Sequence, residues 1–264
     1  MPEFTPDQVA FVTGAASGIG LAISKQLILD GITKIAALDI SESGLSTAFE
    51  SSSAKVLQLV VDCSSESEIE AAVEKTVAEF GRLDVCVNAA GIPSAGPRVK
   101  IDELEKGNTE KVLELNLMGV WLCERAQIRQ FLKQEMRHVS TGLPLKTRGS
   151  IVNLGSLTSH VAIPALSPYI MAKHGVLGLT KADAHDYALE GIRVNCICPG
   201  WIRTQMTSSL RDNPEVSEAV VTRAPMARWG HPEEIAFTAS FLLSDKASFV
   251  TGASISVDGG YGAC

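Results

Sequence analysis

The sequence predicts an α/β protein in which helices cover both faces of a parallel sheet. Short β-branched runs alternate with longer helical patterns along the chain, which implies helical crossover connections between parallel strands. Prolines and glycines stand where such helices would begin and end: Pro168 and Pro232 open helical patterns, and Gly31 follows the first one. No composition break or internal repeat divides the chain, so residues 1–264 are expected to form a single domain.

Strands and helices are expected in alternating order. The strands are expected at Val9–Thr13, Lys34–Asp39, Lys55–Val61, Asp84–Asn88, Ser150–Leu154, Arg193–Cys198 and Ser254–Val257. The helices are expected at residues 18–30, 42–50, 65–80, 109–138, 167–189 and 232–243. Residues 137–149 are expected to be an irregular connection, and residues 200–230, which contain Pro214 and Pro225, are expected to hold a substrate loop.

Composition argues against several classes of protein. With 45% hydrophobic and 20% charged residues, the chain has an ordinary globular composition. A formal net charge of −7 and the lack of basic runs disfavour a nucleic-acid partner or an anionic membrane surface. No stretch approaches the roughly eighteen uninterrupted apolar residues of a membrane span, and the N-terminus is polar. Neither a signal peptide nor a membrane span is therefore expected.

The cysteines show no Cys-x-x-Cys spacing; they are Cys63, Cys86, Cys123, Cys196, Cys198 and Cys264. All but one stand in apolar surroundings, where small buried thiols are the usual interpretation, and a reducing cytoplasm fits best. Cys196 and Cys198 would share one face of a strand, but nothing nearby resembles a set of metal ligands. No metal site is therefore expected.

The first chemical motif is Tyr169-Ile-Met-Ala-Lys173. Residues four apart on a helix lie on one face, about 6 Å apart along the axis. A lysine ammonium beside the phenol would lower the phenol pKa from about 10 toward neutrality, where a general acid or base works well. Ser156, at the end of an apolar run, could hold the substrate oxygen. Alone, the tyrosine and lysine could equally mark a helix surface with a lysine that extends into solvent.

The second motif is the stretch Thr13–Gly20, which follows an apolar strand and opens a helix. Its glycines would let the backbone approach a phosphate, and the amides at the start of the helix attract anions. The strand before and the helix after favour a nucleotide phosphate site over an ordinary loop. The spacing is Gly-x-x-x-Gly-x-Gly rather than the Gly-x-Gly-x-x-Gly of the standard dinucleotide fingerprint.

With these motifs, the chain resembles the short-chain dehydrogenase/reductase family from about Val9 to Gly260. The motifs that carry the resemblance stand in the family's order: Thr13–Gly20, Asn88-Ala-Ala-Gly91, Asn116, the set of Ser156, Tyr169 and Lys173, Pro199-Gly-Trp-Ile-Arg-Thr204, and Asp258-Gly-Gly260. The resemblance implies a Rossmann-like, doubly wound, seven-stranded parallel sheet with helices on both faces. It also implies hydride transfer between a nicotinamide cofactor and a secondary alcohol or ketone.

The same resemblance implies catalytic roles for four residues. Tyr169 would be the acid or base, and Lys173 would lower its pKa and bind the nicotinamide ribose. Ser156 would steady the substrate oxygen, although a serine at a strand end often only caps a turn. Asn116 would hold a water that links Lys173 to solvent; an asparagine that locally bends a helix is the alternative, and it is compatible with that role.

The resemblance also implies a set of cofactor contacts. Asp62 would accept from the adenine amine, Asn88 would stiffen the central strands beside the adenosine, and Ile202 and Thr204 would contact the carboxamide. Caps of strand ends and turns are the alternatives for Asp62 and Asn88. The complete expected set is Gly14, Ser17, Gly18, Ile19, Gly20, Asp39, Asp62, Cys63, Asn88, Ala89, Gly91, Tyr169, Lys173, Pro199, Gly200, Ile202 and Thr204.

Asp39 predicts that the cofactor is NAD rather than NADP. It ends the second strand nineteen residues after Gly20, where dinucleotide folds place the acidic residue that binds the adenosine ribose. A carboxylate there would repel the 2′-phosphate of NADP, and the two positions where a compensating cation often stands hold Ser17 and Ile40. The alternative is that Asp39 only caps the next turn through Ser41.

The substrate is expected to be mainly apolar and cyclic or aromatic, because the candidate pocket walls are Ile92, Pro93, His160, Ile163, Pro164, Trp201 and Met206. Of these, His160 could donate to a polar group of the substrate, or it could be a loop histidine without a role. Ala89 and Gly155 depart from the family's commonest pattern, in which an asparagine and a serine stand there. Neither change removes a proton-transfer group, so only altered local hydrogen bonding is expected.

Other functions remain open. The scaffold could perform non-redox chemistry such as dehydration, epimerisation or cyclisation, or it could be a dinucleotide sensor with a dead site. The intact catalytic set argues against the sensor. Members of the family are commonly dimers or tetramers, and a homodimer or homotetramer is expected because the helices at residues 109–138 and 167–189 carry surplus apolar residues: Leu113, Leu117, Val120, Trp121, Ile128, Phe131, Val176, Leu177 and Leu179.

Overall fold

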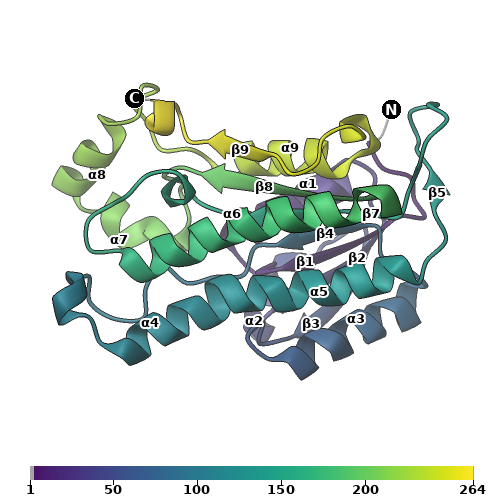
Figure 1. The fold of residues 1–264 in the computed structure, drawn as a ribbon, viewed down its shortest axis with the longest axis horizontal. Coiled ribbons are helices and arrows are strands. Elements are labelled where there is room, and N and C mark those ends of the chain that lie inside the picture. Colours follow the sequence, from purple (N-terminus) through teal and green to yellow (C-terminus); the bar gives the residue numbers. More distant parts are fainter. Residues whose placement is uncertain (1–2, 264) are drawn as a thin grey trace.

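The computed structural model describes residues 3–263 and confirms a seven-stranded parallel sheet with helices on both faces (Figure 1). The strands lie in the order β3-β2-β1-β4-β7-β8-β9. Their bounds are β1 Val9–Thr13, β2 Lys34–Asp39, β3 Lys55–Val60, β4 Val85–Asn88, β7 Gly149–Leu154, β8 Ile192–Pro199 and β9 Ser254–Val257. The strand order reverses between β1 and β4. Ligands of such sheets bind at that point, outside the carboxyl ends of the strands.

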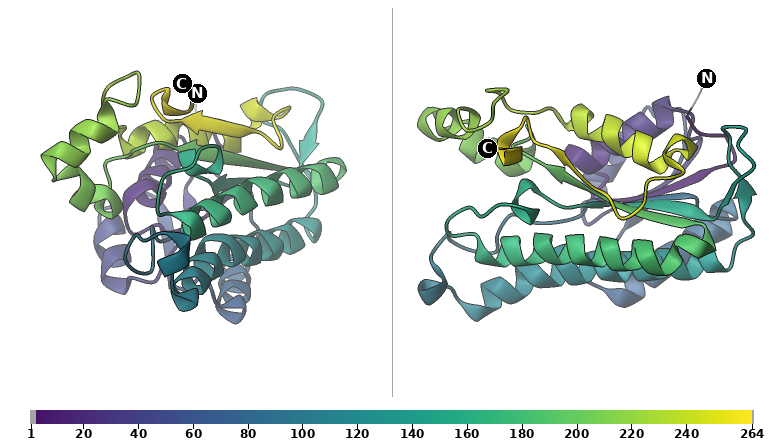
Figure 2. Two further views of the ribbon diagram at one scale, coloured as in Figure 1. Left: turned by 60° about the vertical axis from the view of Figure 1, so that its left-hand side comes forward. Right: turned by 45° about the horizontal axis from the view of Figure 1, so that its top comes forward.

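The helices pack on the two faces of the sheet in separate groups (Figure 2). One face is covered by α1 Gly18–Leu29, α2 Glu42–Phe49 and α9 Pro232–Leu243, and the other by α3 Glu66–Phe80, α5 Val120–Leu132 and α6 Ser167–Tyr187. In β1, Ala10 and Val12 face the first group while Val9 and Phe11 face the second, and all four are fully buried. A strand buried on both faces has no polar side, which explains the continuous apolar runs in the sequence.

The helix expected at residues 109–138 has the wrong bounds, and it is not a single α-helix. The chain forms α4 Lys106–Leu113, a π-helical segment Glu114–Gly119, and then α5, which ends at Leu132. Beyond it lies a short antiparallel hairpin, β5 Arg137–His138 with β6 Lys146–Thr147, in a region that was expected to be irregular.

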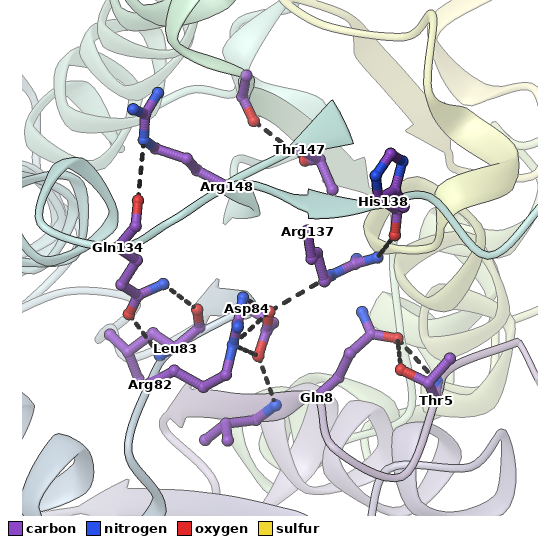
Figure 3. Close-up of polar contacts among 12 residues, drawn as sticks. Thr5, Gln8, Arg82, Leu83, Asp84, Gln134, Arg137, His138, Thr147 and Arg148 are labelled. Carbon is purple, nitrogen blue, oxygen red and sulfur yellow. Dashed lines mark hydrogen bonds and ion pairs between the residues drawn. The ribbon is translucent and has the colours of Figure 1, made fainter. Parts of the chain in front are cut away.

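Arg137 lies in β5, beyond the end of α5, and two buried carboxylates bind it. Its guanidinium makes two 2.8 Å hydrogen bonds to Asp245. Its Nε lies 3.4 Å from Oδ1 of Asp84, a pair that Figure 3 shows. Asp84 is fully buried and also accepts from Arg82 and from the Val9 amide. A buried charge without a partner costs several kcal/mol, so this pairing stabilises the position of Arg137 outside the helix.

Residues 200–230 are more regular than expected. They contain α7 Ser208–Arg211 and α8 Pro214–Val221, and Asn213 caps α8 by accepting from the Val216 amide. Both helices project beyond the carboxyl ends of β8 and β9 (Figure 1). No helix among residues 3–263 is long and apolar enough to cross a membrane.

Candidate active site

Two adjoining clefts lie along the carboxyl edge of the sheet. The first, called here the Tyr169 cleft, is formed by residues that follow β4, β7 and β8 together with α6 and α7. The second, called here the Gly14 groove, follows the turn between β1 and α1 and the ends of β2, β3 and β4. The two share walls at Ile19, Ala89, Gly91 and Thr204. A molecule in the groove can therefore contact one in the cleft.

Helix α6 presents Tyr169 and Lys173 to the Tyr169 cleft one turn apart. Lys173 Nζ lies 5.7 Å from the centre of the tyrosine ring and donates a 2.7 Å hydrogen bond to the carbonyl oxygen of Leu154, the last residue of β7. Ser156 follows β7 and also lines the cleft; its Oγ accepts from the Thr158 amide at 3.1 Å. The fold thus brings the expected tyrosine, lysine and serine together.

The pKa of Tyr169 is raised, whereas a lowered pKa was expected from the sequence. Burial of the phenol is the largest cause; a hydrogen bond with Ser156 acts in the lowering direction, and Cys198 adds a smaller raising effect. The Lys173 ammonium does not offset burial, because it faces the tyrosine ring and its hydrogen bond goes to Leu154. Burial also lowers the pKa of Lys173 to about 8. The ammonium therefore loses its charge as pH rises through about 8.

Asn116 lies in the π-helical segment and is fully buried. Its Oδ1 accepts from the Ile92 amide at 2.8 Å, and its Nδ2 donates to the Ile92 carbonyl oxygen at 2.7 Å. A Cβ on Gly91 would stand 2.9 Å from the same Oδ1, so glycine is needed for this close approach. The side chain therefore fixes the loop after β4, and its second N–H and second lone pair keep capacity for the water expected from the sequence.

The turn between β1 and α1 has the shape of an anion cradle. Gly14 and Gly18 have φ angles of +67° and +53°, which favour glycine, and a Cβ on Gly20 would overlap the carbonyl oxygen of Gly14. Ser17 is the exposed N-cap of α1, and its side chain makes no capping hydrogen bond among the described residues. Its hydroxyl and the first amides of α1 are therefore available to a phosphate.

Asp39 ends β2 at the side of the Gly14 groove. Its Oδ2 accepts from the Ala16 amide at 3.1 Å, and its Oδ1 accepts from the Ser41 amide at 3.0 Å. The bond to Ser41 is the turn cap considered from the sequence, and the bond to Ala16 ties the carboxylate to the glycine turn. Because a carboxylate can accept about four hydrogen bonds, Asp39 keeps capacity for the hydroxyls of a ligand.

One expected cofactor residue, Asn88, lies away from both clefts. It is buried; its Nδ2 donates to Asn153 at 2.9 Å and to Gln127 at 3.2 Å, which joins β4 to β7 and α5. Asp62 lines the groove but also caps its own turn, because its Oδ1 accepts from the Ser64 amide and hydroxyl. The rest of the expected set lines the groove or the cleft: Gly14, Ser17, Gly18, Ile19, Gly20, Asp39, Cys63, Ala89, Gly91, Tyr169, Lys173, Pro199, Gly200, Ile202 and Thr204.

Five of the seven expected substrate walls line the Tyr169 cleft. They are Ile92, Pro93, Ile163, Trp201 and Met206. Neither His160 nor Pro164 is among the residues that line it, and His160 Nε2 instead lies 2.8 Å from the hydroxyl oxygen of Ser254. The sequence did not point to several other lining residues, because they stand in loops and a short helix whose direction depends on tertiary contacts: Arg98, Leu157, Leu166, Thr207 and Leu210.

Gly155, one of the two departures from the family pattern, stands beside Cys196 and Cys198. These cysteines share a face of β8, as expected, with 3.9 Å between their sulfurs. A Cβ on Gly155 would lie 2.8 Å from one sulfur and 2.9 Å from the other. The two thiols thus fill the space that a serine side chain would need. At Ala89, the other departure, the amide donates to the Thr13 hydroxyl at 3.1 Å.

Comparison with known proteins identifies the family. The sequence profile described as enoyl-(acyl carrier protein) reductase matches residues 14–262. The short-chain dehydrogenase fogB of Aspergillus ruber (strain CBS 135680) is 37% identical over 261 residues, which cover 95% of this chain and 95% of that protein. The chain belongs to the short-chain dehydrogenase/reductase family. This short-chain dehydrogenase/reductase is an oxidoreductase, and the dehydrogenases of its family use a nicotinamide cofactor.

Two further relatives bear on cofactor and substrate. The cis-4-hydroxycyclohexanecarboxylate dehydrogenase of Sinomonas cyclohexanicum is 37% identical over 263 residues, 99% of each chain. A gluconate 5-dehydrogenase from Burkholderia cenocepacia J2315, solved in complex with NADP and tartrate, has a TM-score of 0.87 and 30% identity; the match covers 97% of this chain and 96% of that one. The glycine turn, the free Ser17 hydroxyl and Asp39 of the present chain fit a dinucleotide in the Gly14 groove.

Proposed function

We propose that this enzyme transfers a hydride between NAD and a secondary alcohol or ketone on a mainly apolar, cyclic substrate. The observation that carries the proposal is the connection of the two clefts. Ser156, Tyr169 and Lys173 line an apolar cleft that opens directly onto a groove with an anion cradle. That connection allows a nicotinamide in the groove to meet a carbinol or carbonyl carbon in the cleft.

The bound nicotinamide would supply or accept the hydride, and the chain's own residues handle the oxygen and the proton. The Ser156 hydroxyl would hold the substrate oxygen. In reduction, the Tyr169 hydroxyl would donate its proton to that oxygen as it gains negative charge. The raised pKa of Tyr169 keeps the phenol protonated at neutral pH, which suits this direction.

In oxidation, Tyr169 has to take the hydroxyl proton, so its pKa has to fall. The available source of positive charge is Lys173, one turn away on α6. If its ammonium shifts from the Leu154 carbonyl toward the phenol oxygen, the opposite charge would stabilise the phenolate. The proposal therefore includes a change of the Lys173 hydrogen bond when the groove is filled.

The walls of the Tyr169 cleft support an apolar substrate. Ile92, Ile163, Leu166 and Trp201 surround the tyrosine with hydrocarbon and indole surface. The relative named for cis-4-hydroxycyclohexanecarboxylate supports a cyclic skeleton that bears a secondary alcohol. We infer a substrate of that kind for this chain.

Asp39 supports NAD as the preferred cofactor. Its carboxylate lines the groove at the end of β2, and the exposed neighbour Ile40 supplies no cation for a 2′-phosphate. The NADP complex of the gluconate 5-dehydrogenase means that the fold alone does not decide this preference. The decision rests on the charge at the end of β2.

We further propose a homodimer or homotetramer in the cytoplasm. Most of the surplus apolar residues expected on the helices are covered within the chain, but Trp121 is exposed, as are Met118 and Met171 on the neighbouring helical surface. These side chains would be covered by a second copy. Five buried thiols without a disulfide in residues 3–263 support a reducing compartment.

A panel of secondary alcohols and ketones tests the function. Cyclic alcohols with NAD should produce reduced nicotinamide, which is followed by its absorbance, and acyclic alcohols should react more slowly. If no alcohol or ketone changes the nicotinamide absorbance while substrate is consumed, the enzyme performs non-redox chemistry instead. If the protein binds NAD but consumes nothing in the panel, the sensor alternative gains support.

A further inference from the structure

Arg98 stands out among the residues of the Tyr169 cleft because it is charged. The remaining lining residues are apolar, small or hydroxyl-bearing, apart from the catalytic Lys173, and neither aspartate nor glutamate occurs among them. Lys173 is almost completely buried, and its ammonium already donates to Leu154. Arg98 is exposed, so its guanidinium is the accessible cation of this cleft.

Within residues 3–263, Arg98 has no ion pair and no hydrogen-bonded acceptor for its guanidinium. Most other arginines of this acidic protein are engaged, for example Arg137 with Asp245 and Arg228 with Glu234. An unpaired guanidinium beside an apolar cleft is a binding group for an anion, because its planar donors match a carboxylate.

The loop that carries Arg98 is fixed at its base. Asn116 holds both backbone groups of Ile92, and Pro93 and Pro97 restrict the segment between that anchor and the arginine. Arg98 also lines a small hollow on the other side of this loop, next to Tyr169 and Leu166. The arginine is thus attached to a constrained loop that forms part of the cleft wall.

We propose that the substrate carries a carboxylate on the part of its skeleton remote from the reacting carbon, and that Arg98 binds it. This inference rests on the proposed function of the Tyr169 cleft. A single guanidinium with no second accessible cation suits a monoanion such as a carboxylate better than a phosphate dianion. The substrate class is therefore a hydroxy or keto acid on an apolar, cyclic skeleton.

The matched test compares an acid with a neutral alcohol of similar shape. The substrates are cis-4-hydroxycyclohexanecarboxylate and cis-4-methylcyclohexanol, and the variant Arg98→Met keeps a long apolar stem without the charge. We expect the ratio of kcat/KM for the acid to that for the neutral alcohol to fall about tenfold in Arg98→Met, mainly through KM, as is usual for a partly solvated charged hydrogen bond. Arg98→Lys should restore part of the ratio.

The control is Lys100→Met, which removes an exposed cation from the same loop that does not line the cleft. It should leave the ratio unchanged. An equal loss in both variants would mean that the general charge of the loop attracts acids, and it would overturn the role of Arg98. An unchanged ratio in Arg98→Met would also overturn it, while turnover of the neutral alcohol would leave the proposed function intact.

Binding without turnover separates the two proposals. Cyclohexanecarboxylate, which has no hydroxyl to oxidise, should quench the tryptophan fluorescence of the NAD-loaded enzyme, because Trp201 lines the cleft. We expect its Kd to rise about tenfold in Arg98→Met. If the wild type binds this acid through Arg98 but oxidises no alcohol, the proposed function is wrong and the carboxylate site stands. Equal Kd values would exclude the carboxylate site.

Discussion

Lys173 Nζ donates a 2.7 Å hydrogen bond to the carbonyl oxygen of Leu154, so helix α6 is joined to the end of strand β7. Tyr169 lies one turn earlier on the same helix, with its ring centre 5.7 Å from that nitrogen. The lysine ammonium thus has two neighbours that it can stabilise: the carbonyl oxygen at the end of β7 and the phenol of Tyr169.

Tyr169→Phe should leave the affinity for NAD nearly unchanged and reduce turnover by roughly 10² to 10⁴, the range for losing a general acid or base. Steady-state rates and cofactor titration measure the two effects separately. A variant that kept half of the wild-type turnover would show that the proton takes another route. Lys173→Met should impair both turnover and cofactor binding, because the ammonium is expected to lower the pKa of Tyr169 and to bind the nicotinamide ribose.

Asp39 should make the enzyme prefer NAD over NADP by about 5- to 150-fold, or roughly 1–3 kcal/mol, the cost of a close unpaired like charge. Fluorescence titration of both cofactors gives the ratio. Asp39→Asn is the matched variant, because its amide oxygen can still accept from the Ala16 or Ser41 amide. It should reduce the preference, and adding Ile40→Arg should reverse it. Equal or tighter binding of NADP by the wild type would remove Asp39 from this role.

Glu124 should make the stability of the protein depend on pH. This carboxyl is fully buried, and burial raises its pKa to about 8; the Asn153 amide, which donates to it at 2.7 Å, opposes the shift, and nearby Asp183 adds to it. The unfolded chain releases this proton near pH 4.3, so between about pH 4.5 and 8 the folded state binds more protons and loses stability as pH rises.

Glu124→Gln keeps an acceptor for Asn153 but cannot ionise. The variant should therefore lose less stability between pH 5 and pH 8 than the wild type, by up to about 4 kcal/mol. Thermal unfolding of both proteins at the two pH values measures the difference. Tm values that change with pH by the same amount in wild type and variant would mean that the pKa of Glu124 is not raised in the folded protein. Asp183→Asn, which removes the neighbouring charge, should reduce the pH dependence of stability that Glu124 causes without abolishing it.

Gly155→Ala should destabilise the protein, because its new Cβ would stand 2.8 Å from Cys196 Sγ and 2.9 Å from Cys198 Sγ. Overpacking of this kind costs about 1–3 kcal/mol. The loss of stability should be smaller when Cys196→Ala and Cys198→Ala are present, since the free-energy effects of substitutions at contacting residues are not additive. Thermal unfolding of the four proteins completes the cycle. Purely additive Tm changes would mean that the thiols do not restrict this position.

The sequence predicted the positions of some candidate-site residues correctly and those of others incorrectly. The glycine turn at Thr13–Gly20 and the pair of Tyr169 and Lys173 depend on local geometry, namely a strand followed by a helix and a spacing of one helical turn, and such features can be read from short segments. Asn88 has an equally local motif but turns inward to Gln127 and Asn153, because its neighbours across the sheet offer buried amide partners. His160, which is exposed, lies against the Ser254 hydroxyl and does not line the cleft.

The sequence by itself determined the alternation of the main strands and helices and the parallel sheet, because apolar periodicity and turn residues act over a few positions. Only the tertiary structure decided three further features: the pKa of Tyr169 is raised, Arg137 pairs with Asp84 and Asp245 instead of extending a helix, and Arg98 lines the cleft. Burial and charge pairing arise between segments far apart in the chain. Their strength depends on how much water the fold excludes, which no local pattern encodes.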